Sequence, residues 1–205
     1  LGVDRMYTAM IPLGHRPPTI VEEAGPHVTC TLVGGDPILP IAELFEQIRP
    51  LPRRRDMRVA VIVDVLLHSP FTTFDAVATA LQTDAEGAGA ALRATAQCTV
   101  AEAPLIERYA DAWLLGNGPR RIAMPARRAP WFADVVGYAS TRAEQCLSTA
   151  RQWCRAFETI STGDLMRLAG VSRGTAQKIL ATMAERQELR RIGSGRATAY
   201  RLARS

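Results

Sequence analysis

A seven-residue run near the C-terminal end holds side chains suited to recognising a nucleic acid. Ser172, Arg173, Thr175, Gln177 and Lys178 offer hydroxyl, guanidinium, amide and ammonium groups. Guanidinium and amide groups can form paired hydrogen bonds with base edges, and hydroxyls can contact phosphate oxygens. Arg173 and Gln177 are four residues apart, which places them on one face of a helix. This pattern predicts a helix face that reads duplex DNA.

Three arginines flank a Gly-Ser-Gly sequence downstream of that run. Arg190 and Arg191 precede it and Arg196 follows it, and we expect all three to neutralise phosphates. Gly-Ser-Gly is also a fragment of a dinucleotide-binding fingerprint. Here, however, it separates two strand-like runs, whereas the fingerprint joins a strand to a helix, so a phosphate-binding loop is rejected. The alternative to DNA contact is a solvated charged face on a structural domain.

The basic charge of the chain is local. Residues 151–205 hold 11 Arg and Lys against 4 Asp and Glu, a balance of +7, whereas the whole 205-residue chain carries +5. Residues 1–150 therefore carry −2. A basic segment on a chain that is otherwise slightly acidic is the electrostatic footprint of a nucleic-acid-binding module.

The cysteines and histidines do not predict a metal or catalytic site. Cys30, Cys98, Cys146 and Cys154 are too dispersed for a metal-binding knuckle. Cys146 and Cys154 share a helix face with Trp153, which predicts that they are small buried hydrophobic residues. The histidines are isolated in sequence, and no pair of carboxylates stands out as an acid/base couple. We therefore expect no cofactor, no metal and no enzymatic activity.

Two short helices at a turn must position the recognition run. The first covers residues 161–169 and can be capped by Ser161 or Thr162. Gly170, which has no Cβ, suits the sharp turn that follows. Ser172 can cap the second helix, and an apolar stripe on that helix predicts its buried face. The stripe consists of Ala176, Ile179, Leu180 and Met183.

A tight β-hairpin should follow these helices. Its strands are residues 189–192 and 197–202, and the glycines between them tolerate the positive φ of a short turn. With a long helix at 141–157, these elements predict a winged helix-turn-helix. We expect Trp153 and Phe157 to pack beneath the second helix, with stacking on bases as the alternative.

Residues 57–118 show a second winged-helix pattern with the opposite charge. Helices are expected from 57, at 74–81 and at 84–95, and strands at 105–109 and 112–115. This segment holds 3 Arg and Lys against 7 Asp and Glu. Its third helix begins with Asp84 and Glu86, whose negative charge would repel phosphates. We therefore expect a structural or dimerising unit.

The remaining segments predict smaller pieces. Residues 1–34 form a helix and a β-hairpin, in which Val28, Cys30 and Leu32 alternate inward; these are too few elements to bury a face, so we expect the tail of a larger domain. A chain that begins at Leu fits a fragment. Residues 35–56 predict a helix and a basic linker, and 119–130 a linker rich in Pro and Arg. An arm that enters a DNA groove is the alternative for each linker.

Residues 131–205 then make up the C-terminal winged helix, which begins with a short helix at 131–138. The overall composition, 47% hydrophobic and 22% charged, is that of a folded protein. No run of 18 apolar residues and no signal peptide is present in the sequence. We therefore expect a cytoplasmic protein with no membrane contact.

Several longer runs resemble those of a known group of proteins. They are LGVDRMYTAM, RPPTIVEE and HVTCTLVGG near the start, FTTFDAVATALQ and WFADVVGYA in the middle, and GVSRGTAQKIL and GSGRATAYRL at the end. Together they resemble the C-terminal region of bacterial regulators that have a Schlafen/AlbA-type DNA-binding domain and a RecG-related ATP-binding domain. The resemblance implies a DNA-binding transcriptional regulator or a C-terminal piece of one. No nucleotide-binding motif can be carried over to this sequence.

These observations predict an α+β fold, mainly α, with two winged helix-turn-helix units in tandem after a short helix and β-hairpin remnant. The expected partner is double-stranded DNA, bound by a homodimer because one winged helix covers a small footprint. The alternative is an interaction or dimerisation scaffold whose winged helices do not bind DNA.

Overall fold

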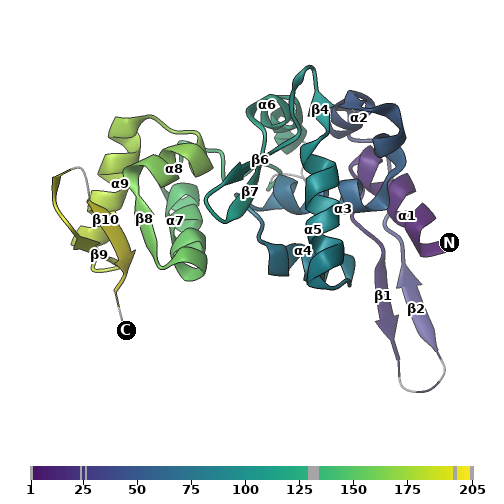
Figure 1. Cartoon of the computed structure of the whole chain (residues 1–205), viewed down its shortest axis with the longest axis horizontal. Helices are drawn as coiled ribbons and strands as arrows, with labels where there is room; N and C mark the ends of the chain where they lie inside the picture. Colours follow the sequence, from purple (N-terminus) through teal and green to yellow (C-terminus); the bar gives the residue numbers. More distant parts are fainter. Residues whose placement is uncertain (1, 24, 26, 129–133, 196–197, 204–205) are drawn as a thin grey trace. The chain divides into compact units, whose positions relative to one another are not determined.

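The chain folds into an α+β structure of helices and small antiparallel sheets (Figure 1). This computed structural model describes residues 2–23, 25, 27–128, 134–195 and 198–203. The backbone divides into two compact units, Leu1–Val135 and Val136–Ser205. Each unit has its own buried apolar core. Among the described residues, no helix is long and apolar enough to cross a membrane.

The first unit begins with the predicted helix and β-hairpin. Helix α1 covers Gly2–Met10 and continues into the short 3-10 helix Ile11–Leu13. Strands β1 (Thr19–Glu22) and β2 (Val28–Thr31) then pair antiparallel. The hairpin projects away from the helices of its unit (Figure 1).

The predicted inward alternation of the second strand is wrong. The side chains of Val28, Cys30 and Leu32 are all exposed, Val28 to 65% and Leu32 to 53%. The physical reason is that a two-stranded hairpin has no second layer of its own. Among the described elements, neither strand joins a larger sheet.

Residues 35–56 contain the predicted helix, but the basic run that follows it is ordered and packed, which a linker would not be. Helix α2 (Leu39–Glu46) leads to strand β3 (Ile48–Arg49) and the 3-10 helix Leu51–Arg55. Ion pairs hold two arginines of that run. Arg53 Nη1 lies 2.7 Å from Asp56 Oδ2, and Arg54 Nη1 lies 2.7 Å from Glu46 Oε2. These contacts join residues close in space, and composition alone does not reveal them.

The middle of the first unit follows the sequence prediction closely. Helices α3 (Met57–His68), α4 (Phe74–Leu81) and α5 (Ala85–Ala96) begin after the caps Asp56, Thr73 and Asp84, whose side chains each accept a backbone N–H. Helix α3 is buried on most sides, as its apolar sequence predicts. The strands β6 (Ile106–Tyr109) and β7 (Ala112–Leu115) follow and pair with each other as a hairpin. Two short strands, β4 (Thr99–Val100) and β5 (Ala103–Pro104), pair with β3 in a separate sheet.

The predicted linker at 119–130 is also wrong where the structure describes it. Helix α6 covers Asn117–Ala123, and the 3-10 helix Met124–Arg128 follows. Pro119 occupies the first turn of α6, where a missing N–H costs nothing. Pro119, Arg120 and Ala126 are buried, so the segment is part of the core. Of the helix predicted at 131–138, residues 131–133 lie outside the described residues and residues 134–138 form turns.

The second unit contains the helices and hairpin predicted for the C-terminal segment. Helix α7 (Ala143–Phe157) precedes strand β8 (Thr159–Ser161), α8 (Thr162–Ala169) and α9 (Arg173–Glu185). Strands β9 (Leu189–Ile192) and β10 (Ala199–Leu202) follow and pair antiparallel as the predicted hairpin. The sequence analysis missed β8, which pairs with β10 and completes a three-stranded sheet in the order β8-β10-β9.

Candidate nucleic-acid interface

Local capping interactions fix both ends of the turn between α8 and α9. Ser161 Oγ accepts the N–H of Asp164 at 3.1 Å, and Asp164 Oδ2 accepts the N–H of Ser161 at 2.6 Å, a reciprocal capping box. Gly170 ends α8 with φ +66°, a conformation that favours glycine. Ser172 Oγ accepts the N–H of Thr175 at 3.2 Å and starts α9. The predicted turn and its caps are therefore present.

Helix α9 has the predicted buried and exposed faces. Its buried face packs into the core of the second unit and consists of Ala176, Ile179, Leu180 and Met183. Arg173, Gln177 and Lys178 are exposed on the opposite face. Because one face is anchored by apolar packing, the polar face is held in a fixed orientation.

The two residues predicted to offer hydroxyl groups, Ser172 and Thr175, contact each other at the start of helix α9. Ser172 is exposed, Thr175 is half-buried, and their oxygens lie 2.9 Å apart. Both stand at the start of α9, where unpaired backbone N–H groups and the helix dipole favour an anion. A phosphate at this position would meet the hydroxyls and the helix end together.

The three predicted arginines of the hairpin do not form one cluster. In the antiparallel register Arg191 lies opposite Tyr200, and Arg190 lies opposite Arg201. Because neighbouring strand residues point to opposite faces, Arg191 and Arg190 lie on different sides of the sheet. Arg196 lies outside the described residues. The Arg191 side also carries Tyr200, whose buried side chain marks the face that packs on the core.

A groove of about 600 Å³ joins the polar face of α9 to the Arg191 side of the hairpin. Arg173 and Gln177 line it from α9, and Arg191 lines it from β9. Arg191 Nη2 donates to Thr198 Oγ1 at 3.3 Å, which holds the guanidinium toward the groove. The remaining lining residues come from α8, α9 and the hairpin: Ser161, Thr162, Gly163, Met166, Ala181, Gly195, Thr198 and Tyr200. Lys178 is exposed on α9 outside this lining.

Two threonines of the groove, Thr162 and Thr198, were not predicted as site residues from the sequence. Thr162 follows the capping serine of α8, and that capping motif is the signal that could have placed it here. Thr198 directly precedes β10, so its position in the groove depends on where that strand lies in the sheet. Together they raise the hydrogen-bonding capacity of the groove beyond the predicted arginines and glutamine.

Contacts beneath the groove hold the second unit together. Arg151 of α7 forms an ion pair with Glu188, and its Nε donates to Glu188 Oε2 at 3.0 Å. Trp153 is buried, with its ring centroid 4.3 Å from that of Phe157, as expected for core packing. Cys154 is buried as predicted, and burial raises the pKa of its thiol to about 11. The thiol is therefore neutral and acts as a small apolar group.

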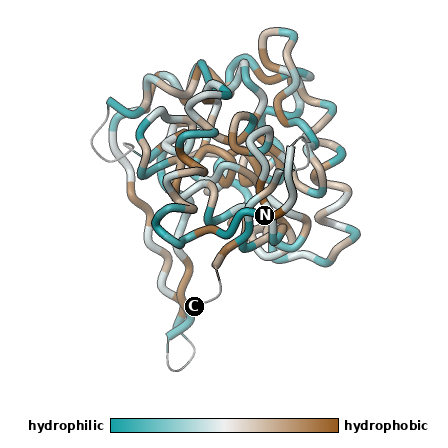
Figure 2. The backbone as a smooth tube through the Cα atoms, turned by 90° about the vertical axis from the view of Figure 1, so that its left-hand side faces the viewer, coloured by the Kyte–Doolittle hydropathy of each residue, from teal (hydrophilic) through white to brown (hydrophobic). Residues whose placement is uncertain are grey.

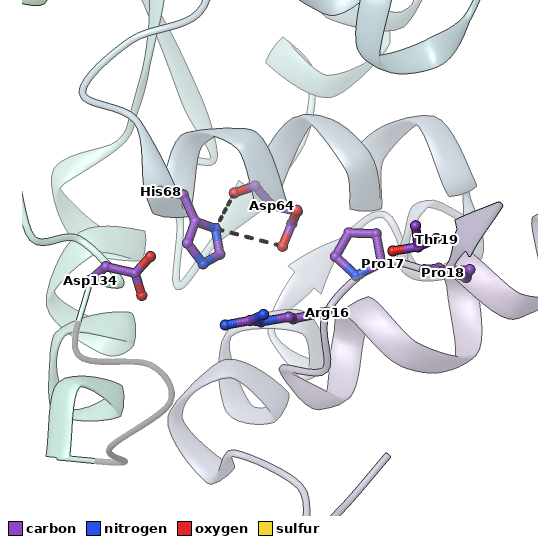
Figure 3. A pocket seen from close by; sticks show the side chains of 7 residues that line it. All are labelled: Arg16, Pro17, Pro18, Thr19, Asp64, His68 and Asp134. Carbon is purple, nitrogen blue, oxygen red and sulfur yellow. Dashed lines mark hydrogen bonds and ion pairs between the residues drawn. The ribbon is translucent and has the colours of Figure 1, made fainter. Parts of the chain in front are cut away.

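The first unit contains a different polar cavity of about 420 Å³ (Figure 3). Asp64 and His68 of α3 face it together with Arg16 and Asp134. His68 Nδ1 lies 2.9 Å from Asp64 O and 3.7 Å from Asp64 Oδ1. Burial raises the pKa of Asp64 to about 6; His68 opposes this shift, and the charge of Asp134 reinforces it. This set of cavity residues was not predicted from the sequence.

The described acidic and histidine side chains at the Asp64 cavity do not form a metal-binding group. Among the described residues, no set of three His, Cys, Asp or Glu side chains could hold a metal ion. The cavity instead contains a carboxylate that is mostly buried, with 19% of its side chain exposed. Such a group makes the stability of this unit depend on pH.

Comparisons with known proteins relate both halves of the chain to other sequences. Residues 39–124 match a family of unknown function (DUF5635). Residues 141–203 match the C-terminal domain of DIP2311-like transcriptional regulators. No curated protein gives a significant match.

A solved structure extends the likeness over nearly the whole chain. The crystal structure of the DIP2311 protein from Corynebacterium diphtheriae superposes with a TM-score of 0.91 at 46% sequence identity. The alignment covers 98% of this chain and 36% of that protein. The chain thus spans about a third of the length of its structural relative, and its second unit is similar to the C-terminal domain of a transcriptional regulator.

Proposed function

We propose that the chain binds double-stranded DNA through the groove between α8, α9 and the β9–β10 hairpin, as part of a transcriptional regulator. The observation that carries this proposal is the convergence of Arg173, Gln177 and Arg191 on one groove of about 600 Å³. The similarity of residues 141–203 to a regulator domain supports it. In this proposal α7–α9 and the hairpin form a winged helix-turn-helix, and α9 enters the major groove.

Each groove residue has a distinct role in the proposed complex. Arg173 and Gln177 point from α9 toward base edges, where paired hydrogen bonds give sequence preference. Arg191 neutralises a backbone phosphate from the hairpin side. Ser172 and Thr175 place a second phosphate at the start of α9.

The cationic side chains outside the groove contribute less to DNA affinity, and their contribution does not depend on the base sequence. Lys178 lies beside the groove residues on α9, and Arg190 lies on the outer side of the sheet. We propose that both add to the positive potential that attracts DNA. We extend the same proposal to Arg196 from its charge alone, because it lies outside the described residues. Their removal should lower affinity on every duplex sequence alike.

We further propose that the groove binds and does not catalyse. Among the described residues that line it, none carries a carboxylate, an imidazole or a thiol. Arginine, hydroxyl and amide groups suit hydrogen bonding to DNA, whereas general acid/base catalysis needs a group that titrates near neutral pH. A DNA-binding role also suits a cytoplasmic location.

We propose that the chain corresponds to the C-terminal region of regulators with Schlafen/AlbA-type and RecG-related domains. Residues 57–118, with the helix order α3-α4-α5 and the β6–β7 hairpin, would then be a first winged helix in tandem with the second. Its acidic balance makes it a structural unit in this proposal.

Selection of binding sites from randomised duplexes tests the proposal directly. We expect a preferred sequence for the wild-type chain, and a relaxed preference for Arg173→Ala and Gln177→Ala, with a loss of ~1–3 kcal/mol on the selected site. Arg155→Ala is the matched control because Arg155 is an exposed arginine of α7 outside the groove lining. Equal loss on all duplexes for the α9 variants would remove their base-reading role. Failure of the wild-type chain to enrich any duplex, with no measurable binding to duplex DNA, would contradict DNA binding.

A further inference from the structure

Ala181 gives the groove of the second unit an exposed apolar surface. It lines the groove from α9 together with Arg173 and Gln177. Among the described lining residues with apolar side chains, Tyr200 is buried and Met166 is half-buried, whereas Ala181 is exposed. Figure 2 shows hydrophilic residues on many outer turns of the chain, so an exposed methyl group among hydrogen-bonding side chains is a distinct feature of this groove.

The three groove residues of α9 are evenly spaced along the helix. Arg173, Gln177 and Ala181 follow one another at intervals of four residues, which keeps them on adjoining parts of one face. Four residues advance an α-helix by about 6 Å. Base pairs in a duplex are about 3.4 Å apart, so each interval corresponds to about two base pairs. The three side chains would therefore meet three different positions of a duplex, in their order along α9.

A side chain as short as that of Ala181 reaches a base only where the helix backbone comes close to it. Gly174 lies two turns before Ala181 on the same face of α9. Apart from its chain neighbours and its own helix backbone, no described atom lies within 4 Å of where a Cβ at Gly174 would stand. Packing within the unit thus does not require a glycine, although glycine is less stable than alanine in a helix. A glycine here does permit close approach by an external molecule.

The charge of α9 changes beyond Ala181. Glu185 lies one turn further along, is the last residue of the helix and is exposed. Its carboxylate would be repelled by the phosphates of a duplex. The part of α9 that suits close contact with DNA therefore runs from Arg173 to Ala181.

We infer that Ala181 recognises the methyl group of a thymine, about two base pairs beyond the base that Gln177 reads. This inference rests on the proposed binding of DNA by the groove and adds base identities to it. The C5 methyl of thymine is an apolar group exposed in the major groove, and an alanine side chain packs against it. The two acceptors of guanine suit Arg173, and the acceptor and donor of adenine suit Gln177. The preferred duplex should therefore present guanine, adenine and thymine in this order along α9.

Replacement of thymine by deoxyuridine tests the contact on the wild-type chain. The replacement removes the methyl group and leaves base pairing unchanged. The duplex is the site that the wild-type chain selects from randomised sequences, and its thymines are replaced one at a time. At one thymine, about two base pairs from the position that Gln177→Ala relaxes, we expect binding to weaken about fourfold, the value of one buried methyl group. Fluorescence anisotropy measures this loss.

Ala181→Gly removes the same contact from the protein side. We expect this variant to bind the thymine and deoxyuridine duplexes equally, each about fourfold more weakly than the wild-type chain binds the thymine duplex. Ala184→Gly is the matched control, because Ala184 is an alanine of the same helix outside the groove lining. It introduces a glycine into α9 as well, and it should keep the full preference for thymine.

The outcomes separate this inference from the proposed function. A wild-type chain that binds its selected duplex but is indifferent to every deoxyuridine replacement would overturn the thymine contact and leave DNA binding intact. A selected site without thymine would do the same. Full preference for thymine in Ala181→Gly would also overturn the inference, because another residue would then contact the methyl group. Absence of duplex binding by the wild-type chain would overturn both.

Discussion

The helices of the two units repeat the same local design with different surfaces. In residues 57–118, Asp84 caps α5 by accepting the N–H of Gly87 at 2.8 Å. In residues 141–203, Ser172 caps α9 in the same way. Both caps start a helix, but the Asp84 carboxylate adds negative charge there, whereas the Ser172 hydroxyl is neutral and does not repel an external anion. The two units therefore use the same capping interaction and differ in the charge of the surface beside it.

The cores beneath these helices should differ little in strength. Leu92 of α5 and Leu180 of α9 are both fully buried. We expect Leu92→Ala and Leu180→Ala each to lower the free energy of unfolding of their own unit by ~2–5 kcal/mol. Urea denaturation followed by hydrogen exchange would assign each loss to a unit. Equal loss in both units from either variant would mean that the two cores unfold as one.

A buried carboxylate distinguishes the first unit from the second. Helix α3 carries Asp64, whose pKa is raised to about 6, with His68, Asp134 and Arg16 around the same cavity. Between pH of about 4 and 6, the unfolded state loses this proton first, so the stability of the first unit falls as pH rises. Above pH 6 the cost is complete, at most about 3 kcal/mol from the size of the shift.

Asp64→Asn should remove this pH dependence. We expect the variant to gain stability relative to the wild-type protein at pH 7.5 and little at pH 4, measured by urea unfolding. Asp36→Asn is the control, since Asp36 is exposed and lies outside the lining of this cavity. A stability difference between Asp64→Asn and wild type that is the same at both pH values would show that the carboxyl titrates normally.

Removing the cap of α5 or of α9 should have a smaller effect on stability, but the two variants should differ in DNA binding. We expect Asp84→Ala and Ser172→Ala each to cost ~1 kcal/mol of unfolding free energy through the lost cap. Only Ser172→Ala should also weaken duplex binding, because α9 lines the groove and α5 does not. Thermal unfolding and fluorescence anisotropy on the same samples separate the two effects. Weaker DNA binding by Asp84→Ala would place the interface in the first unit.

Caps and apolar stripes made helices α3–α5 and α7–α9 predictable from sequence. Ser161, Gly170 and Ser172 act within a few residues of one another, so their roles can be read locally. The predicted linkers failed because composition was used in place of contacts. Pro119 lies in the first turn of α6, and Arg54 is held by Glu46, eight residues away.

The site was predictable only in part for the same reason. The exposed face of α9 follows from helical periodicity, and the separation of Arg190 from Arg191 follows from the alternation of side chains along a strand. Which of the two arginines faces the groove depends on how the hairpin packs in the fold, as does the position of Thr198 just before β10. The Asp64 cavity combines three separate segments, and no local pattern in the sequence joins them.

The salt dependence of duplex binding by Arg191→Ala tests the central claim most directly. If Arg191 contacts a phosphate from the groove, the slope of log K against log[salt] should flatten by about one unit relative to wild type. Arg155→Ala should leave the slope unchanged. An unaltered slope for Arg191→Ala, on a duplex that the wild-type chain binds, would contradict the groove as the DNA-binding surface.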